Sequence, residues 1–207
     1  INPKNQVIVV NAPKKENLVN PTEEEMLAVM AEVNASDIEA YEDNAVKEPL
    51  IAETVVLKGS PVKKTAQNEV FGATEWTLKN GVKVIVKPST LKADEVRLSA
   101  KSLGGASLLS DEDYFTGQLL PAIAAMSGVS KFSATDLRKQ LSGKTASVNL
   151  SVDDYANGLE GYASPKDLET MLQLLYLNFT QPRFSEDDFN TMVKMYKSYV
   201  ENMTSNP

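Results

Sequence analysis

Three clusters of acidic residues are the strongest candidates in this sequence for metal binding or acid–base catalysis. Carboxylates gathered in this way can bind calcium or act as general acids and bases. None of the clusters has the ligand spacing of an EF-hand loop, and two of them follow a serine at an expected helix or turn start, where acids stabilise the helix dipole. We therefore interpret all three as capping and surface residues. They are Asp111-Glu112-Asp113, Asp153-Asp154 and Glu186-Asp187-Asp188.

Two missing residue types exclude several mechanisms. The 207 residues contain no histidine and no cysteine, so Ser110 and Ser133 cannot belong to a Ser-His-Asp triad, and thiolate chemistry and disulfides are excluded. No G-x-G-x-x-G or G-K-[ST] pattern follows Gly104-Gly105, so this pair indicates a strand-end turn and not a phosphate loop. We predict no catalytic, metal-binding or cofactor-binding residue in this chain.

The charge and hydropathy of the chain argue against nucleic acid and membrane partners. Its formal net charge is -7, its basic residues look scattered, and Lys63-Lys64 is too short for a nucleic-acid patch. No segment approaches 18 apolar residues, so we expect no membrane span. The chain begins at Ile1 without an initiator methionine, and we expect it to be a piece of a longer protein.

Residues 1–67 predict a strand, a helix and a linker. Val7 to Val10 is a β-branched run typical of a strand. Thr22 and Glu25 form a capping-box pattern that begins a helix. From 36 to about 67 the chain is acidic and then rich in proline, lysine and threonine, which indicates a linker with a turn of helix at 37–41. The expected apolar stripe of the helix is Met26, Leu27, Met30 and Val33.

A compact domain is expected at 68–207, and it opens on a β-hairpin with a definable register. In EWTLKNGVKVIVKP, a three-residue Lys79-Asn80-Gly81 loop places Leu78 opposite Val82 and Trp76 opposite Val84. This register gives one continuous apolar face, whereas a two-residue Asn-Gly turn would mix apolar and charged residues. We prefer the three-residue loop.

The rest of the domain predicts an α+β fold with a largely antiparallel sheet and helices packed on one face. Strands are expected at 95–102, 145–152 and 155–163, and helices at 116–127 and after Ser133, Ser164 and Ser185. Pro121 is expected to kink or shorten the first helix. The expected stripes are Leu168, Met171, Leu172, Leu175 and Phe179, then Phe189, Met192, Val193, Tyr196 and Val200. The aromatic strand residues Trp76, Tyr155 and Tyr162 are expected in the core.

In this order, the residues resemble the pitrilysin/insulinase family of zinc metallopeptidases, the inverzincins. The family's L-x-N-G-x-x-V hairpin matches Leu78, Asn80, Gly81 and Val84, and its following strand ends in a glycine pair, here Gly104-Gly105. The segment SPKDLETMLQLLYLNFTQPRFSEDDF resembles the family's later pair of helices. The resemblance covers about 71–207 and implies the LuxS/MPP-like half-domain of metallopeptidases.

The resemblance fails at the catalytic motif. Active members carry H-x-x-E-H on the helix after the glycine pair, where this chain has GQLLPAIAAMSG. Alignment sets Leu120, Ile123 and Ala124 against the two histidines and the glutamate, and these side chains can neither bind zinc nor abstract a proton. The family's third ligand falls near Glu201, which we interpret as a surface residue of a helix.

The resemblance therefore implies a degenerate C-terminal half of a bacterial-type zinc endopeptidase. NQVIVVNAP and PTEEEMLAVM would be the end of a preceding homologous half and the connector after it. The partners would be the catalytic half of the same chain, which would hold the zinc, and a peptide substrate. A periplasmic or cell-envelope location is favoured over the cytoplasm. Alternatively, the protein is a catalytically dead homologue used as an assembly or scaffold subunit, or a stand-alone binding module.

Overall fold

The computed structural model describes residues 5, 7–12, 19–40, 42 and 48–204. The chain divides into two compact units, Ile1–Asn44 and Ala45–Pro207, whereas the domain boundary at 67/68 stays a prediction. In the first unit, helix α1 spans Glu23–Ala35. The capping box is confirmed, because the Thr22 N–H donates to Glu25 Oε2 at 2.8 Å and the Glu25 N–H donates to Thr22 Oγ1 at 3.3 Å.

Three expectations for the first unit are wrong. Val7 to Val10 forms no strand, since an isolated strand is unstable without a neighbour and no described residue pairs with this run. Residues 37–40 are not helical, and Tyr41 lies outside the described residues. The expected stripe of α1 is also not buried: Met26 and Met30 are half-buried, while Leu27 and Val33 are exposed.

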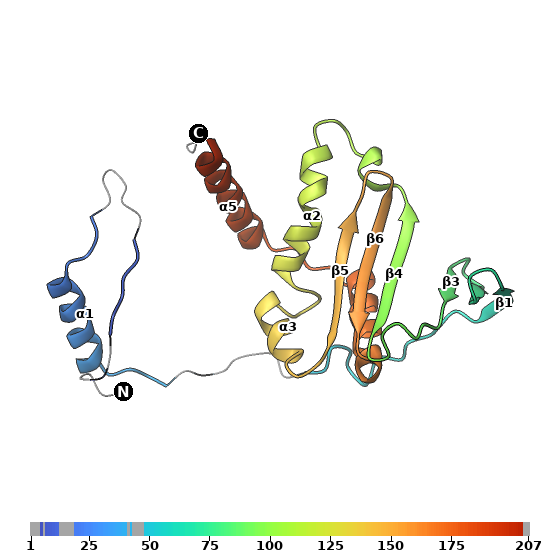
Figure 1. The fold of residues 1–207 in the computed structure, drawn as a ribbon, viewed down its shortest axis with the longest axis horizontal. Helices are drawn as coiled ribbons and strands as arrows, with labels where there is room; N and C mark the ends of the chain where they lie inside the picture. The colour runs from blue at the N-terminus through green and yellow to red at the C-terminus, as the bar shows by residue number, and fades with distance from the viewer. Residues whose placement is uncertain (1–4, 6, 13–18, 41, 43–47, 205–207) are drawn as a thin grey trace. The chain divides into compact units, whose positions relative to one another are not determined.

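The second unit begins with a three-stranded antiparallel sheet in the order β1-β2-β3 (Figure 1). Its strands are β1 (Val62–Asn68), β2 (Ala73–Leu78) and β3 (Lys83–Val86). The hairpin register is confirmed: Trp76 lies opposite Val84, and the Leu78 N–H donates to the Val82 carbonyl at 2.8 Å. Gly81 supplies the left-handed position with φ 92°. Strand β1 lies in the segment expected to be a linker, so that expectation is wrong there.

A second antiparallel sheet has the order β4-β6-β5. Its strands are β4 (Val96–Leu103), β5 (Ala146–Val152) and β6 (Ala156–Ala163). The α+β class and these three strands are confirmed, but the strands divide between two sheets instead of forming one. Side chains that alternate along β4, β5 and β6 give the sheet an inner apolar face, which includes Leu98, Ala100, Val148, Leu150 and Leu159.

The expected helices are present. They are α2 (Tyr114–Ser127), α3 (Ala134–Gln140), α4 (Leu168–Thr180) and α5 (Glu186–Thr204), with 3₁₀ turns η2 (Gly105–Leu108) and η3 (Pro165–Asp167). Ser133 and Ser185 cap α3 and α5, because their hydroxyls accept the N–H groups of Asp136 and Asp188. Pro121 does not shorten α2, which stays helical on both sides of it.

The core lies between the second sheet and its helices. Helices α2 and α4 pack against β5, and α4 also packs against β6. The buried cluster is Leu50, Val129, Phe132, Leu174 and Leu177. The inward side of α4 is Met171, Leu174 and Leu177, so the expected stripe is wrong at Leu172 and Phe179, which are 46% and 67% exposed. In α5 only Met192 of the expected stripe is buried.

Asp167 joins the start of α4 to the start of β5. One of its carboxylate oxygens accepts the Ser164 hydroxyl at 2.6 Å and the Thr145 N–H at 2.9 Å, and the residue is 9% exposed. The hydrogen bond from Ser164, followed by that from Thr145, lowers the pKa of Asp167 below its ordinary value of 3.8. Because the folded-state pKa is the lower one, the ionised carboxylate stabilises the fold above pH 3.8 and loses this effect as the pH falls.

Asp167→Asn is therefore expected to lower the melting temperature by several degrees at neutral pH. The difference from the native chain should shrink as the pH falls below 3.8, because the native carboxylate then also becomes neutral. Circular dichroism melts over a pH series measure this. Asp111→Asn, in an exposed loop, removes the same charge and should leave the melting temperature nearly constant. A difference for Asp167→Asn that does not vary with pH would contradict this role of the charge.

Gly105 is a second constraint on the fold, because it packs against the turn between β5 and β6. Its φ is 71°, and a Cβ there would lie 2.2 Å from the Asp153 carbonyl oxygen and 2.5 Å from the Ala156 nitrogen. Gly143 has a similar φ of 77° but open space around it. Both positions disfavour a side chain in the left-handed region, and only Gly105 adds steric overlap with backbone.

We expect Gly105→Ala to lower the free energy of unfolding by about 3 kcal/mol or more, and Gly143→Ala by about 1 kcal/mol. The difference between the two losses of free energy gives the cost of the steric overlap at Gly105, because both variants have the cost of the left-handed backbone in common. Urea denaturation followed by circular dichroism measures both. Equal losses would mean that the turn moves freely away from Gly105.

Candidate functional site beside helix α2

The three positions that the resemblance sets against the family's H-x-x-E-H motif lie in one stretch of α2 and are apolar. Leu120 is 37% exposed, Ile123 is 7% exposed, and Ala124 is half-buried. None carries a nitrogen, oxygen or sulfur atom in its side chain, so this part of α2 does not fit a zinc ion. Within the described ranges, no group of three or more histidine, cysteine, aspartate or glutamate side chains is placed to hold a metal.

The other sequence-predicted residues lie apart from this stretch. Glu201 is exposed on α5, in agreement with its interpretation as a surface residue. The Asp113 carboxylate accepts the Ser110 hydroxyl at 2.8 Å just before α2. Asp153 and Asp154 occupy the β5–β6 turn, where their carbonyls accept N–H groups from the start of η2. The acidic clusters therefore sit at turns and helix starts.

The Asp154 side chain also accepts the Tyr114 hydroxyl at 2.9 Å. This hydrogen bond raises the pKa of Tyr114 above its ordinary value. A phenol with a raised pKa is a poorer proton donor, so the contact is better suited to holding the first turn of α2 against the β5–β6 turn than to acid–base chemistry.

The C-terminal end of α2 is fixed by the loop between α4 and α5. The Arg183 Nε donates to the Ser127 carbonyl at 2.9 Å, and the Ser185 N–H donates to the Ser127 hydroxyl at 3.2 Å. Ser127 is only 1% exposed. A cation at a helix C-terminus also matches the helix dipole. The loop that contains Arg183 and Ser185 thus positions the C-terminal end of α2.

A pocket of about 170 Å³ lies between α2 and β5. Its wall on α2 is formed by small residues, Ala124, Ala125 and Gly128. Most of the remaining lining is apolar, and it comes from α3, β5 and α4: Val129, Leu137, Leu141, Ser147, Val148, Asn149, Leu150, Leu174 and Asn178. We call this the α2–β5 pocket. This pocket is not among the features predicted from the sequence, although the small residues of AIAAMSG were the available signal.

Strand β5 presents unpaired backbone groups along the edge that borders the pocket. The Ser164 N–H donates to Thr145, and the Asp153 N–H donates to Ala156, which marks the odd-numbered residues of β5 as the ones bonded to β6. Since bonded and non-bonded pairs alternate in an antiparallel ladder, the N–H and C=O of Val148 and Leu150 point away from β6. Neither residue's backbone has another hydrogen-bond partner within the described residues.

One polar atom of β5 is without a partner. The Ser147 Oγ is inaccessible to solvent and makes no hydrogen bond within the described part of the chain. Ser147 pairs with Tyr162, so its side chain lies on the outer face of the sheet, and the hydroxyl is not part of the pocket's apolar side. The pocket itself combines an apolar lining with open strand-edge backbone, a combination that suits an extended peptide.

The outer face of the second sheet is polar and holds a shallower pocket of about 350 Å³. Tyr162 lines it together with Arg97 and Glu160. Tyr162 is 47% exposed and Tyr155 is 75% exposed, so the expectation that both are core residues is wrong. Tyr162 lies on the face of β6 that points away from the helices, and Tyr155 lies in the β5–β6 turn before the strand begins. Trp76 is half-buried on β2.

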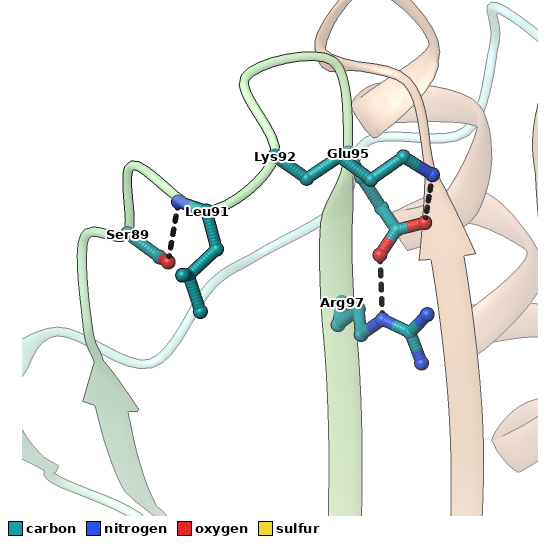
Figure 2. A network of polar contacts seen from close by, with 5 residues as sticks. All are labelled: Ser89, Leu91, Lys92, Glu95 and Arg97. Atoms are coloured by element: carbon teal, nitrogen blue, oxygen red, sulfur yellow. Dashed lines mark hydrogen bonds and ion pairs between the residues drawn. The ribbon is translucent and has the colours of Figure 1, made fainter.

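At the start of β4, Glu95 is held by two basic residues (Figure 2). Lys92 Nζ lies 2.8 Å from one carboxylate oxygen, and Arg97 Nε lies 2.5 Å from the other. The hydrogen bond from Lys92, followed by that from Arg97, lowers the pKa of Glu95. Because both oxygens of this carboxylate are bound to basic side chains and its ionised form is favoured, Glu95 suits a structural role at the start of the strand better than a catalytic one.

Comparisons with known proteins find related zinc proteases. The chain is 27% identical over 112 residues to the probable zinc protease PqqL of Haemophilus influenzae, a match that covers 54% of this chain and 12% of that protein. It is 28% identical over 165 residues to a PQQL-like zinc protease of Arabidopsis thaliana, covering 77% of this chain and 14% of that protein. The matched residues thus span about an eighth of the length of these relatives. No family model matches it.

Two solved structures share the fold. The periplasmic protease PqqL from Escherichia coli matches with a TM-score of 0.68 and 17% identity, over 90% of this chain and 20% of that one. The ferredoxin protease FusC, solved as a point mutant in complex with Arabidopsis ferredoxin, matches with a TM-score of 0.61 and 17% identity, over 82% of this chain and 19% of that one. No helix in the described ranges is long and apolar enough to cross a membrane.

The sequence relatives are zinc proteases, and the shared architecture is that of the PqqL proteases. They bear out the resemblance carried by the hairpin, the glycine pair and the later two helices. The chain is a relative of the pitrilysin/insulinase-like zinc metallopeptidases.

Proposed function

We propose that this chain is a non-catalytic part of a zinc-dependent endopeptidase of the pitrilysin/insulinase family, in which it forms a wall of the peptide-binding chamber. The observation that carries the proposal is the replacement of the motif positions by Leu120, Ile123 and Ala124, on a helix whose position is nevertheless fixed by Arg183 and Ser185. In this proposal, α2 keeps its structural role without the zinc ligands and the general base that active members of the family carry on it.

The zinc and the general base would lie in another part of a longer protein. The curated relatives are zinc proteases several times longer than this chain, and the chain itself has no histidine. By analogy with the periplasmic PqqL of Escherichia coli, we place the protein in the periplasm. The substrate would be a peptide or protein, as the protease names of the relatives imply.

The role of the wall would be to hold an extended peptide. The α2–β5 pocket and the open backbone of Val148 and Leu150 support this role, because strand addition uses such main-chain groups for affinity and adjacent pockets for side-chain selection. The opposite edge of the sheet, β4, begins at the Lys92–Glu95–Arg97 ion pairs, and charged side chains at an edge discourage pairing. We therefore assign the peptide to the β5 edge.

The test of the non-catalytic role compares the full-length parent protein with this 207-residue chain. We expect the parent to hold about one zinc ion per chain and to cleave an unstructured reporter peptide, and we expect this chain to hold none and to cleave nothing. Mass spectrometry of bound metal and a fluorescence-quenched peptide assay measure both.

Two results would contradict the proposal. A parent without metal and without peptidase activity would favour the scaffold alternative. Zinc bound stoichiometrically by this chain alone would mean that the alignment of the lost motif is wrong.

The peptide-holding role predicts that filling the α2–β5 pocket weakens peptide binding. Ala125→Leu places a larger side chain at its α2 wall, whereas Ala122→Leu makes the same change at an exposed position of α2 outside the pocket. With a fluorescein-labelled Val-Thr-Val-Thr-Val peptide, we expect Ala125→Leu to reduce affinity about tenfold and Ala122→Leu to leave it unchanged. Fluorescence anisotropy measures the affinity.

A second peptide separates strand addition from simple hydrophobic contact. The same sequence with N-methylated amides lacks the donors that a strand must offer to Val148 and Leu150. We expect it to bind at least about tenfold more weakly. Equal binding of both peptides, or equal effects of the two alanine changes, would remove the β5 edge from the proposal.

A further inference from the structure

The basic residues of the chain are not scattered, because one segment holds a large share of the lysines. Residues 58–92 contain seven lysines, no arginine and two glutamates, a formal charge of +5. The other residues contain 14 of the 21 basic side chains and 26 of the 28 acidic ones, a formal charge of -12. The segment includes the whole β1-β2-β3 sheet. One small sheet is thus positive in a chain that is otherwise acidic.

The lysines of this segment are free to meet a partner. All seven are exposed, and Lys92 is the one that forms an ion pair within the described residues, with Glu95 (Figure 2). Across the sheet, Thr77 lies between Lys64 on β1 and Lys83 on β3, so these two lysines share a face. Unpaired like charges on one sheet face repel each other, and an opposite charge from outside relieves this.

Within the second unit the sheet is also uncovered. No described helix of that unit packs against it as α2 and α4 pack against β5 (Figure 1). Lys64 and Lys83 share their face with the half-buried Glu75, whose carboxylate accepts a hydrogen bond from Asn68. On the opposite face, Val62 and Val82 are 50% exposed and Trp76 is half-buried. A face with two exposed lysines and a partly apolar face are therefore both available for contact with a partner.

We propose that the β1-β2-β3 sheet is a docking surface for a separate acidic polypeptide, which contacts Lys64 and Lys83. Charge complementarity carries this assignment: a segment with a formal charge of +5, two of whose lysines share one face of the sheet, attracts carboxylate-rich chains at long range and orients them. In the proposed protease the acidic polypeptide is a substrate, and to that extent the inference rests on the proposed function.

The charges favour a polypeptide over nucleic acid or a lipid surface. All seven basic residues are lysines, whereas arginine is the residue preferred for bidentate binding of phosphate. The acidic remainder of the chain would also repel a long polyanion or an anionic membrane that extends beyond the sheet. A polypeptide with spaced carboxylates can pair with the lysines without the continuous negative charge of a nucleic acid or an anionic membrane.

The experiment measures binding of this chain to a fluorescein-labelled peptide of alternating glutamate and valine, at low and high salt. In the test variant, Lys64→Glu and Lys83→Glu are combined. The control combines Lys194→Glu and Lys197→Glu, which change two exposed lysines of α5 and give the same net charge. We expect the test variant to bind at least about tenfold more weakly, and the control to bind within about twofold of the native chain.

Binding by the native chain should also weaken with added salt, because exposed charges are screened beyond about 10 Å at 0.1 M. A milder variant, with Lys64→Gln and Lys83→Gln, removes the charges without reversing them and should show an intermediate loss. Circular dichroism of each variant establishes that the sheet is folded. Emission from Trp76, the single tryptophan of the chain, follows binding on the same sheet.

Three results would overturn the proposal. The first is an equal loss of peptide affinity in the test and control variants, which would mean that the net charge of the chain, and not the position of the lysines, determines binding. The second is binding of the glutamate peptide that does not respond to salt. The third is tighter binding to phosphatidylglycerol vesicles or to a DNA duplex that is lost in the Lys64/Lys83 variant, which would assign the surface to phosphate. None of these results depends on zinc or on peptidase activity. The docking surface and the proposed function are therefore tested by different measurements, and either can be wrong without the other.

Discussion

The arrangement of this domain depends on the contact between the end of α2 and the loop that joins α4 to α5. The Ser127 carbonyl accepts a hydrogen bond from Arg183 Nε, and the Ser127 hydroxyl accepts one from the Ser185 N–H. Immediately after it, a Cβ at Gly128 would lie 2.3 Å from the Phe132 carbonyl oxygen, so only glycine permits the turn into the core. Val129 and Phe132, which are 2% and 0% exposed, then pack beneath the sheet.

This contact positions α2 without a metal. A zinc site contributes folding free energy through its ligands, but here the position of the helix comes from hydrogen bonds and apolar packing at its C-terminal end. Leu120 and Ile123 lie earlier in the helix and take no part in that contact. In the proposed non-catalytic role, apolar residues at these positions therefore do not displace α2, and small residues such as Ala124 and Ala125 leave the α2–β5 pocket beside the strand.

The features that local physics determines could be predicted from the sequence. The Thr22–Glu25 capping box and the serine caps of α3 and α5 depend on residues three positions apart. The hairpin register, with Trp76 opposite Val84, depends on keeping apolar residues on one face.

The features that depend on distant partners could not be predicted in the same way. Strand β1 has little apolar character and exists because β2 pairs with it. The buried side of α4 is Met171, Leu174 and Leu177 instead of the stripe through Leu172 and Phe179, because the sheet meets that helix from only one direction. Lys64 and Lys83 are 19 residues apart in the sequence, and only the strand register brings them to one face.

The exposed apolar residues of α5 follow the same logic. Met195, Tyr196 and Tyr199 are 61%, 46% and 61% exposed, although the helix is amphipathic and its first turn is capped by Ser185. Exposed apolar side chains gathered on one helix are typical of surfaces that pack against another part of a larger protein. The curated relatives are several times as long as this chain, so such a surface suits a role within a longer protein. The cap of α5 depends on neighbouring residues and could be predicted, whereas the burial of its apolar side chains depends on distant partners and is not determined by sequence periodicity alone.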